Sequence, residues 1–220
     1  MRPTPRCAQR SDRPPAVSRL AHPDPAERLA ALAELDQRPD PRAHPALLRA
    51  ALGDPVESVR RDAALVLEQQ TRRSLEELAL EELRKAPGPE LAGWLLRSPR
   101  EAVRVSAVDV LETLGTPAAA AHLAVRLEAE PSPGVRLLIT RALAEAAGRG
   151  AGEAQGAVME ALRAGVQDPE PAVRRAAARA LALNGDRTGV PCLVQALDSA
   201  SPEERRELVA ALRTATGEDL

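Results

Sequence analysis

Arginine is the most regularly spaced chemically active residue in this chain. Four segments share the pattern Pro-x-x-x-Val-Arg, and an Asp, Glu or Ser stands six residues before each of these arginines. A guanidinium forms strong, charge-assisted hydrogen bonds with a carboxylate, and a polar side chain at that spacing could also cap the helix that follows. We therefore predict a ladder of bonds between neighbouring layers. Its predicted members are Asp54, Arg60, Arg104, Glu130, Arg136, Asp168 and Arg174.

Other side chains that could do chemistry stand alone in the sequence. Cys7 and Cys192 are far apart in the sequence, so we do not expect a disulfide framework. His44 and His122 have no partner at His-x-x-x-His or Cys-x-x-Cys spacing, and no glycine-rich phosphate loop occurs. We predict no catalytic residue, no metal site and no cofactor. Ser74, Ser106 and Ser201 have no nearby His and Asp arrangement that would suggest a nucleophile.

The arginines lie on amphipathic helices. In each segment a Val precedes the Arg, a small apolar residue follows three positions later and a Leu seven positions later, so the three form one helical stripe. Two weaker copies, at Arg28 and Arg205, extend the series, and successive arginines are 31 to 44 residues apart. A repeat of this length predicts helical hairpins that bury their stripes against one another.

A second apolar helix follows each first helix except the last. We expect Gly115, Gly148 and Gly185 to close first helices, because glycine adopts positive φ without strain. The longest interval contains surplus residues, and we predict a short inserted helix near residues 87–97. The predicted second helices span residues 45–52, 74–83, 117–127, 154–162 and 189–197.

The last repeat is therefore incomplete. Its first helix has no following partner, so Leu208 and Leu212 are expected to form an apolar edge that favours weak self-association.

These patterns predict an all-α fold, an α-solenoid of about six stacked helical hairpins. The chain has no Phe or Tyr and a single Trp, so its core must consist of Leu, Val and Ala. Residues 1–21 are rich in Arg and Pro and are expected to be a disordered leader. Residues 22–220 are expected to form a single solenoid domain.

The segments around Asp54 and Asp168, with Asp-Pro-x-x-x-Val-Arg followed by Ala and Leu, resemble the HEAT repeat, in particular the short bacterial type of phycobilisome-lyase-like proteins. The resemblance covers about residues 22–214. It implies a right-handed curved stack in which Asp and Arg form the ladder between repeats. Because the acid is replaced at His22, Ser98 and Ser199, we expect the ladder to be interrupted there.

Four glutamates make the second helix of the second repeat strongly acidic. They are expected to form a broad face near the only tryptophan, which is the one aromatic anchor available for a protein interface. A solvated helix face, partly neutralised by Arg84 and Lys85, is the alternative interpretation. The predicted partner-binding residues are Glu76, Glu77, Glu81, Glu82 and Trp94.

These features favour a non-catalytic scaffold that holds another protein. The net charge of −2 gives no general attraction to nucleic acid or lipid, and a DNA glycosylase would need a basic, aromatic groove. The resemblance leaves one alternative, a bilin lyase-like chaperone or enzyme that acts on a chromophore-bearing protein. No apolar stretch suits a secretory signal or a bilayer span, so we expect a cytoplasmic protein without nucleic-acid or membrane partners.

Overall fold

The computed structural model describes residues 14–198 and 200–217, which form helices joined by turns with no strand among them. The predicted all-α fold is thus confirmed, and the helices pack in neighbouring pairs. They group into two compact units, Met1–Leu78 and Ala79–Leu220, and the division falls inside helix α5 (Leu75–Lys85). A single domain over residues 22–220 stays a prediction.

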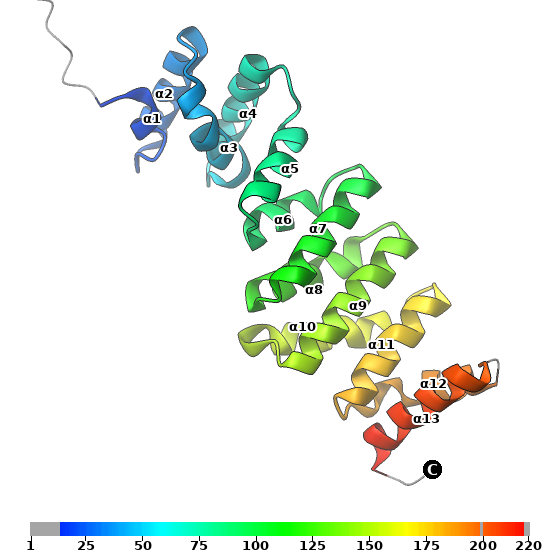
Figure 1. The fold of residues 1–220 in the computed structure, drawn as a ribbon. Helices are drawn as coiled ribbons and strands as arrows, with labels where there is room; N and C mark the ends of the chain where they lie inside the picture. The colour runs from blue at the N-terminus through cyan, green and yellow to red at the C-terminus, as the bar shows by residue number, and fades with distance from the viewer. Residues whose placement is uncertain (1–13, 199, 218–220) are drawn as a thin grey trace, which may run out of the picture. The chain divides into compact units, whose positions relative to one another are not determined.

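The first unit contains two hairpin layers. Helix α2 packs against both α1 and α4, and α3 packs against α4 (Figure 1). Asp24 caps α2, because its carboxylate accepts the N–H of Ala26 at 2.9 Å. The helices are α1 (Ala16–Arg19), α2 (Pro25–Gln37), α3 (His44–Gly53) and α4 (Glu57–Thr71), with a 3-10 turn at Pro41–Ala43 before α3.

The predicted disordered leader, residues 1–21, is wrong for its last residues, whereas residues 1–13 lie outside the described part. Helix α1 forms within this segment and packs against α2. Arg19 is buried, and its guanidinium pairs with Glu34 and lies 3.6 Å from Glu27. Ala16 and Leu20 are buried beside it. These contacts order a segment whose composition alone suggested disorder.

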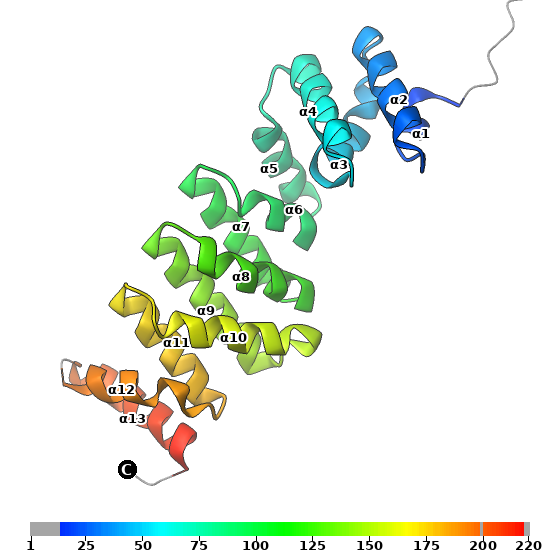
Figure 2. The same ribbon diagram turned by 180° about the vertical axis from the view of Figure 1, so that it is seen from behind.

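The second unit is a stack of two helical layers. Figures 1 and 2 show α7, α9, α11 and α13 on one side and α6, α8, α10 and α12 on the other. Each helix of the first layer packs against the next one in that layer, and α8 packs against α6 and α10. The helices are α6 (Pro89–Leu95), α7 (Glu101–Leu114), α8 (Pro117–Ala129), α9 (Pro133–Arg149), α10 (Gln155–Gly165), α11 (Pro171–Leu183), α12 (Val190–Leu197) and α13 (Pro202–Thr216).

The apolar stripe predicted from the repeat forms the core of both units. Each of its members in the four complete copies is at most 5% exposed. Burial of such side chains is the main stabilising term for a helix whose opposite face is polar. The stripe residues are Val59, Ala63, Leu67, Val103, Ala107, Leu111, Val135, Ile139, Leu143, Val173, Ala177 and Leu181.

Helix α6 lies where the inserted helix was predicted, but it is part of the stack. It packs against α7 and α8, just as α8 packs against α9 and α10. The approach to α8 is close, since a Cβ on Gly93 would lie 2.6 Å from Nδ1 of His122. A larger residue at this position of α6 would force the His122 ring to move. Helix α6 therefore occupies the position of a second helix, in the same layer as α8 and beside α7.

Glycine ends the first helices less regularly than predicted. Gly115 does close α7, with φ of 58°. The prediction for Gly148 is wrong, because α9 continues through this residue to Arg149, and its C-cap is Gly150, which has φ of 78°. After α11, Asn184 is the C-cap and Gly185 follows with φ of 75°.

The apolar edge predicted at the last repeat is also wrong. Leu208 and Leu212 are 7% and 3% exposed, because α13 packs against both α11 and α12 of the same chain. The side of α13 that faces solvent carries charged and small residues instead, including Glu203, Arg206 and Ala210. The expected reason for self-association is therefore removed.

Candidate functional site

Each ladder arginine that has a carboxylate partner bonds to two different repeats. In the first unit, Arg28 directs Nη1 to the carbonyl oxygens of His22 and Pro23, at 2.8 and 2.9 Å. Its other edge meets Asp54, with Nε 2.7 Å from Oδ2 and Nη2 2.9 Å from Oδ1. The guanidinium thus ties its own helix start to the start of the next repeat.

The second unit repeats this geometry twice. Arg104 donates Nη1 to the carbonyl of Ser98 and forms a two-pronged bond with Glu130, at 2.9 Å for both Nε–Oε2 and Nη2–Oε1. Arg136 donates Nη1 to the carbonyl of Glu130 at 3.1 Å and binds Asp168 at 2.7 and 3.1 Å. Planar, two-pronged pairs of this kind fix orientation as well as distance.

The acid of each rung also caps a turn. Asp54, Glu130 and Asp168 each accept the N–H two residues further on, at 2.8 to 2.9 Å, and the Ser98 hydroxyl accepts that of Arg100 at 3.0 Å. The prediction that these residues are the helix N-caps is wrong by two positions. The N-caps are Val56, Arg100, Ser132 and Glu170.

Two predicted ladder arginines lack the carboxylate half of this arrangement. Arg60 donates Nη1 to the carbonyl of Asp54 at 2.6 Å, and Arg174 donates to those of Asp168 and Pro169 at 2.7 and 2.9 Å. Among the described residues, neither has a carboxylate partner. The acid of each rung pairs with the arginine of the preceding repeat, so Asp168 belongs to Arg136. Ser199, at the position opposite Arg174 in register, lies outside the described residues.

Glu130 is the most enclosed acid of the ladder. Its side chain is 0% exposed and also accepts bonds from Arg126, at 2.8 and 3.0 Å. Burial raises the pKa of Glu130, but the bonds from Arg104, Ser132 and Arg126 outweigh it and leave the pKa below its ordinary value. The same balance of burial and arginine bonds lowers the pKa of Asp54 and of Asp168.

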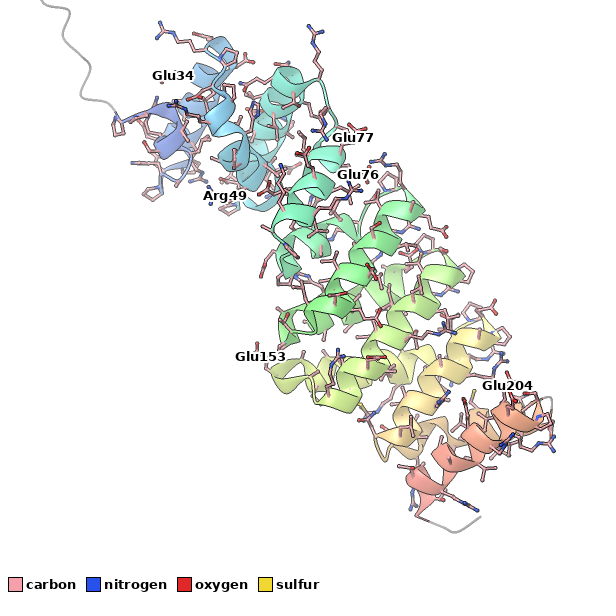
Figure 3. All side chains as sticks on the ribbon, viewed as in Figure 1. Glu34, Arg49, Glu76, Glu77, Glu153 and Glu204 are labelled. Carbon is pink, nitrogen blue, oxygen red and sulfur yellow. The ribbon has the colours of Figure 1, made fainter. Side chains whose placement is uncertain are left out.

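The acidic residues of α5 are partly engaged in local contacts. Glu77 and Ser74 cap the helix reciprocally, at 3.2 and 3.3 Å, and Glu81 pairs with Lys85 at 2.7 Å. Figure 3 labels Glu76 and Glu77 near the start of α5. Glu82 takes part in neither of these contacts. Both the helix-capping role and the pairing with a basic neighbour fit the solvated-face interpretation better than a dedicated site.

The structure does not bring the whole predicted docking patch together in one unit. Glu76 and Glu77 belong to the first unit, whereas Glu81, Glu82 and Trp94 belong to the second. Trp94 lies on α6 and is partly exposed. A patch that joins these residues stays a prediction.

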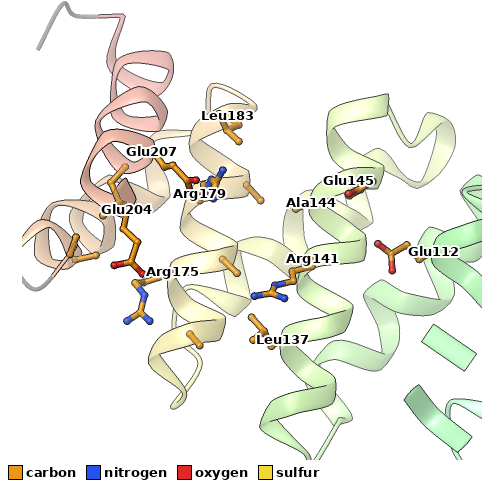
Figure 4. Close-up of a pocket in the computed structure, with 16 residues that line it drawn as sticks. Glu112, Leu137, Arg141, Ala144, Glu145, Arg175, Arg179, Leu183, Glu204 and Glu207 are labelled. Atoms are coloured by element: carbon orange, nitrogen blue, oxygen red, sulfur yellow. Dashed lines mark hydrogen bonds and ion pairs between the residues drawn. The ribbon is translucent and has the colours of Figure 1, made fainter. Parts of the chain in front are cut away.

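A groove across the first layer of the second unit was not predicted. It has a volume of about 770 Å³ and runs over α11 between α9 and α13 (Figure 4). Alanines of α11 at i, i+4 and i+8 form its floor, which in the sequence look like ordinary helix formers. The lining residues are Glu112, Leu137, Arg141, Ala144, Glu145, Ala172, Arg175, Ala176, Arg179, Ala180, Leu183, Ala196, Ala200, Glu204, Glu207 and Leu208.

The charged residues of the groove differ in how far they are already used. Arg179 pairs with Glu207 at 2.6 Å, and the two side chains point toward each other in Figure 4. Glu145 pairs with Arg149 at 3.2 Å. Glu204 accepts the N–H of Ser201, which completes the capping box of α13 and lowers the pKa of Glu204.

Three lining charges remain. Among the described residues, no hydrogen bond or ion pair engages the side chains of Arg141, Arg175 or Glu112. Arg141 extends from α9 toward α11 in Figure 4. Both arginines are exposed, so they are hydrated and accessible.

The described residues contain no cluster of His, Cys, Asp and Glu that could hold a metal ion. Cys192 is a half-buried free thiol whose pKa is raised by burial, although Arg174 and Arg175 act in the opposite direction. A raised pKa reduces the thiolate fraction and hence reactivity. Cys7 lies outside the described residues.

The three serines considered as nucleophiles have structural hydrogen bonds. Ser74 and Ser201 cap α5 and α13, and the hydroxyl of Ser106 donates to the carbonyl of Ala102 at 3.0 Å. None of these bonds involves a histidine that could act as a general base.

No helix in the described part of the chain combines the length and hydropathy that crossing a membrane requires.

The paired layers and the Arg–acid rungs define an α-helical repeat protein. Residues 126–213 match the family model of HEAT repeats, so this segment of the chain is built of HEAT repeats. The phycobilisome-lyase-like subtype stays a prediction. No curated protein sequence matches the chain. Among solved structures, the chain is similar to an engineered protein determined by the Northeast Structural Genomics Consortium, with 23% identity over 92% of this chain and 95% of that one and a TM-score of 0.48.

Proposed function

We propose that this protein is a non-catalytic scaffold that binds another protein through the exposed faces of its helical repeats. HEAT repeats generally mediate protein–protein interaction, and proteins built from them are typically not enzymes. Stacked hairpins offer an extended surface on a rigid core. The observation that carries the proposal is the groove over α11, where Arg141 and Arg175 are accessible and form no hydrogen bond or ion pair with the described residues, although Arg175 acts electrostatically on Glu204.

The contrast with the ladder supports this interpretation. In both units the ladder arginines with carboxylate partners are largely buried and hold adjacent repeats together. Arginine enclosed in this way is unavailable to a ligand. The accessible polar groups of the second unit lie instead on helix surfaces, which suits recognition of another macromolecule rather than chemistry in a closed pocket.

We expect the partner to be a protein rather than nucleic acid or a membrane, and we place the scaffold in the bacterial cytoplasm. The net charge of −2 and the mixed charges around the groove give no general attraction to polyanions. The lyase-like alternative rests on the repeat resemblance alone, and no site residue favours it.

Reciprocal capture tests the proposal. The intact chain serves as bait, and recovered proteins are quantified by mass spectrometry against matrix alone. We expect one partner to be recovered in nearly the same molar amount as the bait. We also expect that partner, when it is used as the bait, to recover this chain. If no protein exceeds the matrix background in both directions, the scaffold function is wrong.

Helix α5 is a second surface that this experiment can assess. A basic partner would contact Glu81 and Glu82, which belong to the same unit as Trp94, the aromatic anchor. Glu82→Lys is the sharpest variant, because Glu77 caps the helix and Glu81 pairs with Lys85. Weaker capture by Glu82→Lys, with capture unchanged by Glu153→Lys, an exposed residue of the second unit that lies on neither α5 nor α6, would support this surface. Equal capture by both variants would show that α5 is not a binding surface for this partner.

A further inference from the structure

The groove over α11 has a floor of small side chains from that helix. Ala172, Ala176 and Ala180 line the floor, while α9 and α13 rise on either side with larger residues such as Leu137 and Leu208. Methyl groups leave a shallow channel into which another chain's side chains could fit. A cavity of about 770 Å³ lies in the range of recognition sites but is open along its length.

The lining of this channel carries charges of both signs, and its arginines differ in whether they are already bonded within the chain. Arg179, Glu145, Glu204 and Glu207 are each engaged within the chain, as described above. The remaining cations, Arg141 and Arg175, come from neighbouring helices on opposite sides of the channel floor. Arginine pairs with carboxylates in two-pronged geometry, which the ladder of this same protein illustrates.

We propose that the groove over α11 binds an acidic peptide segment of a partner protein, with its carboxylates on Arg141 and Arg175 and an apolar side chain over the alanine floor. The inference rests on the proposed scaffold function and names its partner class. Glu112, at the α7 end of the groove, has no partner among the described residues and favours a basic residue at that end of the peptide.

The same lining disfavours nucleic acid as the occupant. Four glutamates border the groove, and a phosphate backbone with a charge on every nucleotide would lie close to several of them. A peptide can place its carboxylates only where the arginines are. Mixed charge therefore selects a peptide with a specific pattern rather than a uniform polyanion.

Peptide binding to the intact protein tests this proposal. The probe is a fluorescein-labelled peptide with one glutamate on either side of an Ala-Leu-Ala segment and a lysine at one end, and the matched probe has Lys in place of both glutamates. Affinity is measured by anisotropy, and the side-chain Nε–Hε signals of arginine are followed by NMR. We expect the glutamate peptide to bind and to shift the signals of Arg141 and Arg175.

Single substitutions locate the binding. Arg141→Ala and Arg175→Ala should each weaken the glutamate peptide by about tenfold, whereas Arg206→Ala, an exposed arginine of α13 outside the groove, should not. Both groove arginines are exposed, so the variants should fold normally, which circular dichroism verifies.

Several results would overturn the proposal. These are an absence of glutamate-peptide binding, equal binding of the lysine peptide, equal weakening by Arg206→Ala, or equally tight, arginine-dependent binding of oligo(dT). A partner captured reciprocally by the intact chain, but equally well by Arg141→Ala and Arg175→Ala, would keep the scaffold function and overturn this groove alone.

Discussion

Helix α9 carries two arginines five residues apart that have opposite environments. Arg136 is largely enclosed, with one edge on Asp168 and one on the backbone of its own repeat. Arg141 is exposed, lines the groove and has no partner among the described residues. The residue type is the same, so position along the repeat decides the role. An arginine beside the buried valine at the helix start stabilises the stack, and one on the outer face remains available.

This contrast between ladder and groove can be broken or sharpened by substitution. Changes in the ladder should lower stability and leave peptide binding in the groove intact. Changes in the groove should do the reverse.

The largest effect is expected at Glu130. Glu130→Ala leaves Arg104 and Arg126 without their carboxylate, and Arg104 is 4% exposed. Removing one partner from a buried ion pair costs about 3–5 kcal/mol. Urea unfolding followed by circular dichroism measures this loss. Glu128→Ala, an exposed neighbour on α8, is the control and should change stability by no more than about 0.5 kcal/mol. Similar values for the two variants would mean that the rung contributes little.

A smaller effect separates two arginines that look equivalent in the sequence. Arg136→Ala should cost about 1–3 kcal/mol, because it leaves the largely buried Asp168 with only its turn hydrogen bond. Arg174→Ala removes bonds to two backbone carbonyls but strands no described carboxylate, so about 0.5–1.5 kcal/mol is expected. Equal losses in paired unfolding curves would contradict the assignment of Asp168 to Arg136.

Acid should weaken the ladder. The pKa values of Asp54, Glu130 and Asp168 are lowered in the folded protein, so their contribution is present above the ordinary carboxyl pKa and is lost as the pH falls through the folded-state values. Glu130→Gln is less stable at neutral pH but has one fewer such group. Its melting temperature should therefore fall less than that of the wild type between about pH 5 and about pH 3. Parallel curves would show that Glu130 does not titrate with folding.

The smallest effect on stability is expected in the groove. Arg141→Ala and Arg175→Ala should each change the unfolding free energy by no more than about 0.5 kcal/mol, since neither side chain has a hydrogen bond or ion pair with a described residue. Thermal unfolding of both variants checks this. A loss above about 1 kcal/mol would give these arginines a structural role and weaken the contrast with the ladder.

Much of the fold could be predicted because the repeat fixes burial. Val, small residue and Leu at constant offsets from the arginine identify the stripe, and Val135, Ile139 and Leu143 are all buried. Helix ends were predicted less well. Gly148 and Gly150 are equally able to adopt positive φ, so the sequence does not say which one ends α9, and in the structure it is Gly150 that has positive φ.

The partners in the ladder could be predicted by type but not by direction. An arginine six residues after an acid could reach that acid or the next repeat's, and the spacing allows both. In the structure the backbone carbonyl of residue i−6 occupies the near edge of Arg136, so its carboxylate partner must come from the next layer. The groove depends on how α9, α11 and α13 are positioned relative to one another, which no local sequence pattern specifies.

The two-sided rung has a consequence for how such a chain can grow. Residues 130–167 begin with an acceptor for Arg104 and contain Arg136, the donor for Asp168. A tandem duplication of this segment would place each new guanidinium opposite a new carboxylate, so every added arginine and every added acid would have an ion-pair partner. Head-to-tail complementarity thus allows such an array to lengthen by whole modules without an electrostatic penalty at the junction.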